Sequence, residues 1–122
     1  MAMTPTRLTG PAAFATSAGD MYTVPYTSGQ TTTTVIKEIV LCNTSASAQT
    51  VTLYLKPKNV TVASSHIFIN SFSLAANETV TISTSMVLTN SNNTAGDTYS
   101  DKIRGLASAT SVNYILNGYE GY

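Results

Sequence analysis

The sequence predicts an all-β protein, an antiparallel β-sandwich with an extended N-terminal arm. Short runs rich in Val, Ile, Thr and Tyr recur along the chain, and several alternate between apolar and polar residues as half-buried strands do. Segments rich in Gly, Pro, Asn and Ser, which favour turns, separate these runs. No window shows helical periodicity over more than two turns. Immunoglobulin-like and jelly-roll sandwiches share this pattern, so both topologies remain open.

The first segment, residues 1–20, is predicted to be an arm that precedes a single sandwich domain of residues 21–122. Its Pro and Gly residues lie among small side chains, and only Leu8 and Phe14 are large and apolar. Such a composition favours an extended segment over a strand. A chain of 122 residues is long enough for one domain with a hydrophobic core and too short for two such domains.

The centre of the fold is predicted to be a β-hairpin formed by residues 35–42 and 51–55, joined by a polar connection. The second run alternates regularly, so one of its faces goes to a core. In the first run, strict alternation places Ile39 on one face and Ile36 and Val40 on the other. Both faces are then apolar, and the second face needs a cover beyond the sandwich itself.

Further short strands are expected on both sides of this hairpin. The run at residues 66–72 again carries apolar groups on both faces, with Phe68 and Phe72 on one of them. Residues 118–122 are expected to form a tail. The other predicted strands cover residues 21–24, 78–82, 86–88, 98–104 and 112–116.

The arm and the doubly apolar strands together predict an interface with partner molecules. Oligomers commonly bury such patches about a symmetry axis, so a homo-oligomer, either a dimer or a trimer, is expected. The residues assigned to this interface are Leu8, Phe14, Ile36, Val40, Phe68 and Phe72.

Charge and targeting features narrow the function classes. Charged residues make up 10% of the chain and balance to a net charge of zero, so nucleic-acid binding is not expected. No charged segment followed by a long apolar stretch occurs at the N-terminus, so neither a signal peptide nor membrane binding is expected, and the protein should remain soluble in the cytoplasm where it is made. The lone Cys42 cannot form an internal disulfide and is expected to be a small strand residue.

Residues that could carry chemistry are sparse, and no enzyme, metal or cofactor is expected. His66 is the only histidine, and the chain has no Gly-x-Ser-x-Gly motif. Asn92, Asn93, Asp97 and Asp101 offer oxygen ligands, but their spacing matches no calcium loop, so solvated turn residues are the default.

The seven tyrosines raise a second class of function, carbohydrate binding, because aromatic rings on a neutral sandwich can stack on sugars. Tyrosine is also a good strand and interface residue, apolar in its body and polar at its tip, and that explanation is favoured.

Several short segments in a fixed order resemble small structural proteins of tailed bacteriophages. The opening at residues 4–13 is similar to proteins from phages of actinobacteria, and the similarity spans nearly the whole chain. One departure is the longer segment at residues 90–95 before Gly96 and Asp97. The segments that carry the resemblance are residues 4–13, 22–25, 36–45, 50–55, 74–79, 96–97, 112–113 and 118–120.

The resemblance implies a virion component without enzymatic activity, and it transfers no catalytic residue. The leading hypothesis is a capsid decoration or minor capsid protein that binds the shell and stabilises it. Its partners would be the major capsid protein or other virion proteins, and its location would be the virion, assembled in the host cytoplasm. The alternative is a tail or baseplate component, including a module that binds carbohydrate on the host surface.

Overall fold

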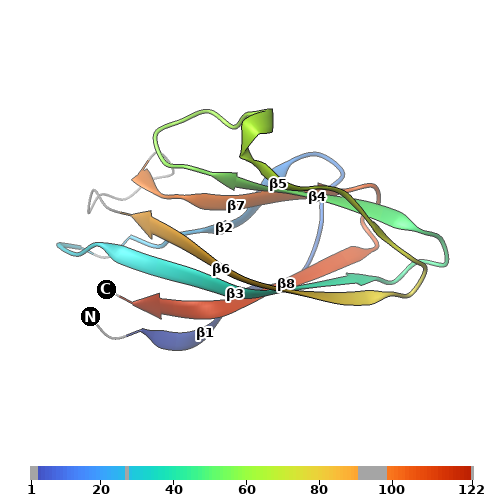
Figure 1. Cartoon of the computed structure of the whole chain (residues 1–122), viewed down its shortest axis with the longest axis horizontal. Helices are drawn as coiled ribbons and strands as arrows, with labels where there is room; N and C mark the ends of the chain where they lie inside the picture. The colour runs from blue at the N-terminus through green and yellow to red at the C-terminus, as the bar shows by residue number, and fades with distance from the viewer. Residues whose placement is uncertain (1–2, 27, 91–98, 122) are drawn as a thin grey trace.

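A computed structural model describes residues 3–26, 28–90 and 99–121 of the chain (Figure 1). Within these ranges the protein is an antiparallel β-sandwich of two four-stranded sheets, which confirms the predicted fold class. The elements are β1 (Thr4–Ala13), β2 (Gly19–Thr23), β3 (Thr32–Asn43), β4 (Gln49–Lys56), the 3-10 turn η1 (Ser64–His66), β5 (Ile67–Leu74), β6 (Thr79–Asn90), β7 (Lys102–Ala107) and β8 (Val112–Gly121).

The strand order decides between the two sandwich topologies that the sequence left open. One sheet has the order β1-β8-β3-β6 and the other the order β2-β7-β4-β5. Every connection between successive strands crosses from one sheet to the other, except the one from β4 to its neighbour β5. Eight strands wound in this way form the two Greek keys of a jelly roll.

The predicted hairpin of residues 35–42 and 51–55 is wrong, because β3 and β4 lie in different sheets. Strand β3 pairs with β6 and β8, whereas β4 pairs with β5 and β7. The polar connection between them crosses the sandwich instead of folding back. Asn43 fixes this crossing: its buried amide donates to the carbonyls of Ser47 at 2.8 Å, Leu74 at 3.2 Å and Ala75 at 3.1 Å.

The predicted N-terminal arm is not confirmed, because most of it is strand β1. This strand pairs with β8 from Thr4 opposite Glu120 to Ala13 opposite Asn113. Prolines and glycines are tolerated here because β1 is an edge strand and shifts register twice, between Arg7 and Ala12.

Two other boundaries differ from the prediction. Residues 79–90 form the single strand β6 where the sequence predicted two pieces, because the hydroxyl side chains between them fit an exposed strand face. Residues 118–121 extend β8 and are not a tail.

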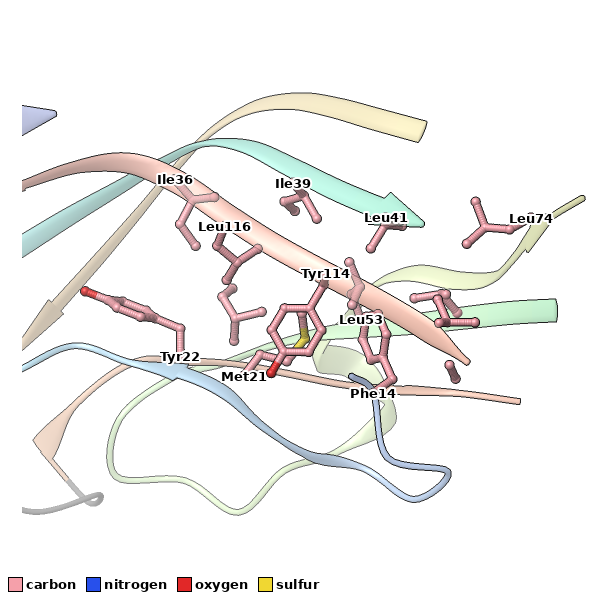
Figure 2. Close-up of a cluster of buried hydrophobic side chains, with 14 of the residues drawn as sticks. Phe14, Met21, Tyr22, Ile36, Ile39, Leu41, Leu53, Leu74, Tyr114 and Leu116 are labelled. Atoms are coloured by element: carbon pink, nitrogen blue, oxygen red, sulfur yellow. The ribbon is translucent and has the colours of Figure 1, made fainter. Parts of the chain in front are cut away.

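The core lies between the sheets and is built by side chains from both (Figure 2). Ile36, Ile39 and Leu41 point into it from β3 and are fully buried. Phe14 and Tyr114 meet at a ring-centroid distance of 4.7 Å in a tilted arrangement, which joins the segment after β1 to β8. No helix in the described part of the chain has the length and apolar character needed to cross a membrane.

Candidate interaction surface

A β-bulge in β3 decides which side chains reach the surface of the β1-β8-β3-β6 sheet. The register between β3 and β8 shifts between Ile36 and Glu38, so Lys37 is an extra residue on β3. The alternation of side chains therefore changes phase at this point. Ile36 and Ile39 are both fully buried although they are three residues apart, and Val40 lies on the outer face.

An apolar row crosses the outer face of this sheet. Val35 of β3 lies opposite Val87 of β6 on one side and Tyr119 of β8 on the other, and Tyr119 lies opposite Pro5 of β1. Residues directly opposite one another share a face, so these four form one row with a member from every strand. We call Pro5, Tyr119, Val35 and Val87 the apolar row; Val87 is 60% exposed and Tyr119 39%.

The row borders an open hollow of about 440 Å³ that is lined by Met3, Val35, Lys37 and Tyr119. Tyr119 and Val35 therefore contribute both to the row and to the depression beside it. An exposed apolar row beside a hollow is typical of a site of protein contact.

A second apolar group lies farther along the same face. Val40 lies opposite Ile115 of β8, and together with Pro11 and Cys42 these residues line a hollow of about 200 Å³. Cys42 is half-buried here. The outer face thus carries apolar side chains towards both of its ends.

A polar band separates the apolar row from this second group. Lys37 donates to the Ser85 hydroxyl at 2.7 Å, and Asn117 donates to the Glu38 carboxylate at 3.0 Å. Arg7 lies opposite Asn117 on the other side of β8. The band carries charges of both signs, so the face has no single-sign field that would favour a nucleic acid.

The structure places one of the six predicted interface residues, Val40, on this face. Phe14 and Ile36 are core residues, and Leu8 and Phe72 are half-buried against the core. Neither Phe14 nor Ile36 is therefore available to a partner in the folded chain.

Phe68 is the remaining member of the set, and it lies on the other sheet. It is 37% exposed on the edge strand β5. The sequence placed Phe68 and Phe72 on the same face, but Ser71 takes a positive φ of 50° and β5 shifts register against β4, so Phe72 turns to the core. The six residues do not form one surface, and an interface role stays a prediction for Leu8, Val40, Phe68 and Phe72.

Sequence reasoning missed the apolar row because it assumed unbroken alternation in β3. A signal was present: Lys37 and Glu38 are adjacent charged residues inside an apolar run. Two neighbours cannot both face solvent in a regular strand, so a bulge between the apolar positions was the better interpretation.

The residues considered for chemistry have structural partners. The Asp101 carboxylate accepts the backbone N–H groups of Lys58 and Thr89, both at 2.9 Å, and the His66 Nδ1 atom accepts the N–H of Ala63 at 3.0 Å. Among the residues that the structure describes, no group of three His, Cys, Asp or Glu side chains could hold a metal ion. The other candidate calcium ligands, Asn92, Asn93 and Asp97, lie outside the described residues, as does most of the segment at 90–95.

The tyrosines within residues 3–26, 28–90 and 99–121 are not brought together on one face. Tyr22 and Tyr114 are core residues, and burial raises the pKa of both hydroxyls above the ordinary value. For Tyr22 the Glu120 carboxylate, 2.6 Å from the hydroxyl, adds to this increase. Tyr54 and Tyr119 lie on the outer faces of different sheets.

Comparison with known proteins gives one structural similarity. No protein-family model matches the chain, and no curated protein matches it. Among solved structures, the chain is similar to a chain in the "Structure of infectious bursal disease virus Gx strain", with a TM-score of 0.49 and 11% sequence identity. The match covers 98% of this chain and 30% of that chain, so this protein spans about a third of the length of the chain it matches.

Proposed function

We propose that this protein is a non-enzymatic structural subunit of a bacteriophage virion, a capsid decoration or minor capsid protein. It binds the shell through the outer face of the β1-β8-β3-β6 sheet. The observation that carries the proposal is the apolar row, in which Pro5, Tyr119, Val35 and Val87 lie side by side on four strands of one sheet. Covering such a row removes apolar area from water, the main favourable term in most protein association.

The size of the face is adequate for a specific contact. Four strands spaced about 4.8 Å apart, with a rise of about 3.3 Å per residue over about ten residues, give a face of roughly 600 Å². Standard interfaces bury about 800 Å² on each partner. The face therefore supplies most of the area that a stable contact needs, and neighbouring loops supply the remainder.

Support for a virion comes from two other sources. The sequence resembles small structural proteins of tailed phages over nearly its whole length. The jelly roll is also a recurrent fold of viral capsid proteins, although lectins and cupins use it too, so this support is an analogy at the level of the fold. The resemblance also allows a tail or baseplate component, which binds elsewhere on the same particle.

The test measures how much of the protein is bound to purified particles. In the variant Tyr119→Asp a carboxylate would have to be desolvated at the centre of the row, so we expect occupancy to fall at least tenfold. Asn70→Asp adds the same charge at an exposed position on β5 of the other sheet and is expected to keep full occupancy.

The ratio of this chain to the major capsid protein, measured by quantitative mass spectrometry on gradient-purified particles, gives the occupancy. Circular dichroism confirms that both variants are folded. Full occupancy of a folded Tyr119→Asp protein would show that the outer face is not the contact. Electron cryomicroscopy of the same particles separates a position on the shell from one on the tail.

A further inference from the structure

The four edge strands of the sandwich are not equally protected against pairing with another strand. The edges are β1 and β6 in one sheet and β2 and β5 in the other. An open edge offers unpaired backbone N–H and C=O groups, and folded proteins usually blunt it with proline, charge, bulges or a short length.

Three of these edges carry such devices. Strand β1 contains Pro5, Arg7 and Pro11 and shifts register twice against β8. Strand β2 has only five residues and includes Asp20. Strand β5 shifts register twice against β4 and contains Ser71 with a positive φ.

Strand β6 is protected only at its C-terminal end, where the Asp101 carboxylate accepts the Thr89 N–H at 2.9 Å and the Asp101 N–H donates to the Thr89 carbonyl at 3.1 Å. It runs for twelve residues, Thr79–Asn90, without a proline, a glycine or a charged residue. Its one irregularity is the register shift against β3 between Ser83 and Met86. Its inward-facing Val80, Ile82 and Met86 are only partly buried, because no strand in the described part of the chain lies beyond them.

We propose that β6 pairs antiparallel with β6 of a second copy of this chain, about a two-fold axis, to form one continuous eight-stranded sheet. A strand without charges places no like charges opposite one another when it meets itself, so β6 is suited to self-pairing. Only a copy of this chain is certain to supply an edge of the same length and the same lack of charge. Because the other three edges are blunted, the assembly closes at two copies.

The inward-facing side chains of β6 also match those of β6 in a second copy. In the register centred on Thr84, Ile82 lies opposite the partner's Met86 and Val80 lies opposite the partner's Leu88. Both pairs are apolar and lie on the inner face, where Val80, Ile82 and Met86 are only partly buried and Leu88 is already buried in the core. Pairing thus supplies both the missing backbone partners and the missing side-chain contacts.

The test is the mass of the protein in solution. Sedimentation equilibrium of the wild-type chain is expected to give a dimer. In Ser83→Lys the new ammonium group can reach Glu38, which lies opposite Ser83 on β3 within the same subunit, so the fold should tolerate it. Near the two-fold axis, however, two such lysines meet, and we expect the dimer dissociation constant to rise at least tenfold.

Ala13→Lys is the matched control, because it places the same charge at an exposed position on β1, the opposite edge of the same sheet. It is expected to leave the dimer unchanged. Hydrogen exchange supplies a second readout: amides of residues 79–88 should become more protected as the protein concentration rises, while the protection of amides in β1 should not depend on concentration.

A wild-type chain that is monomeric at every accessible concentration would overturn the proposal. So would a dimer that survives Ser83→Lys, or one that only Tyr119→Asp dissociates, since the dimer would then use the outer face. If β6 becomes protected only on particles, its occupant is a strand of another protein. These outcomes concern solution mass and β6 exchange, whereas the proposed shell contact is judged by particle occupancy, so either idea can fail without the other.

Discussion

Asn43 shows how one buried polar side chain can hold a connection between sheets. Its side-chain amide donates to two carbonyls at the start of the β5–β6 turn, those of Leu74 and Ala75, and to the Ser47 carbonyl in the β3–β4 connection, and its side-chain oxygen accepts the Ser45 N–H at 3.0 Å. The side chain is fully buried with its hydrogen bonds satisfied, which is the condition for a polar group to stabilise a core.

Asn43→Ala is expected to lower the free energy of unfolding by about 3 kcal/mol, because several buried carbonyl groups lose their donor. Urea unfolding followed by circular dichroism measures the loss. Asn117→Ala is the control: that side chain is half-buried and makes one bond, to Glu38, so its loss should be about 1 kcal/mol. Equal effects would mean that the connection does not depend on Asn43.

Tyr22 links the two sheets through its hydroxyl. The group lies 2.8 Å from the Thr34 hydroxyl of β3 and donates to the Glu120 carboxylate of β8 at 2.6 Å. Tyr22→Phe keeps the ring in the core but removes both bonds, so we expect a loss of about 2 kcal/mol at neutral pH, measured by urea unfolding. A loss below about 0.5 kcal/mol would show that the hydroxyl bonds add no net stability.

The same residue predicts a dependence on alkaline pH. Burial and Glu120 raise the pKa of Tyr22 in the folded protein above the ordinary value of about 10. As the pH rises through about 10, the unfolded chain releases this proton before the folded chain does, so stability that is present below that pH is lost above it.

Thermal melting at a series of pH values between about 8 and 11 measures this loss. The decline should be shallower in Tyr22→Phe, and some decline should remain because burial also raises the pKa of Tyr114. Identical pH profiles for the wild-type chain and Tyr22→Phe would contradict the assignment.

At the scale of elements, strand β1 depends on one glycine. Gly10 has a φ of +89°, and a Cβ atom added there would collide with the backbone carbonyl oxygen of Tyr114 on β8. Gly10→Ala therefore combines an unfavourable backbone conformation with a clash against an atom that cannot rotate away.

We expect Gly10→Ala to cost about 3 kcal/mol and to increase hydrogen exchange throughout β1. Gly29→Ala is the matched control, since Gly29 also has a positive φ, +73°, but has nothing within 4 Å of the added atom. Its cost should be about 1 kcal/mol, from the backbone conformation alone. If Gly10→Ala and Gly29→Ala lower the melting temperature equally, the close approach of β1 to β8 does not require a glycine at position 10.

The positions of most strands could be predicted from the sequence, but their full lengths and their pairing partners could not. Alternating and β-branched residues located β3, β4 and β5 within a few positions. It missed β1 because Pro and Gly usually end strands, and only the edge position of β1 makes them acceptable. The pairing of β3 was missed because its partners β6 and β8 are far away along the chain, and a local pattern carries no information about them.

The candidate surface was predictable in kind but not in its residues. Excess apolar strand surface indicated a contact, and Val40 does lie on the outer face. The bulge at Lys37 then moved Ile36 into the core and brought Val35 out beside Val87 and Tyr119. One extra residue in β3 thus reversed, for the residues before Lys37, which side chains point to the core and which point outward.

At the scale of the whole molecule, the jelly roll makes the N-terminal segment part of the cooperative unit. Deleting residues 1–13 would remove β1 and strip β8 of its neighbour on one side. Leu8 and Ala12, which pack against the core, would be lost as well.

The shortened chain is therefore expected to lose its cooperative thermal transition, measured by near-ultraviolet circular dichroism on heating. An arm that only docks on a partner would instead leave the transition unchanged. This experiment thus distinguishes a structural strand from a detachable segment.

Because β1 and β8 are antiparallel neighbours, Thr4 lies opposite Glu120, and the start of β1 and the end of β8 lie at the same corner of the sandwich (Figure 1). A short linker could therefore join them, and a circular permutant opened in the β3–β4 connection would keep every strand in its place. Cargo fused before β1 or after β8 would leave the subunit at the same corner.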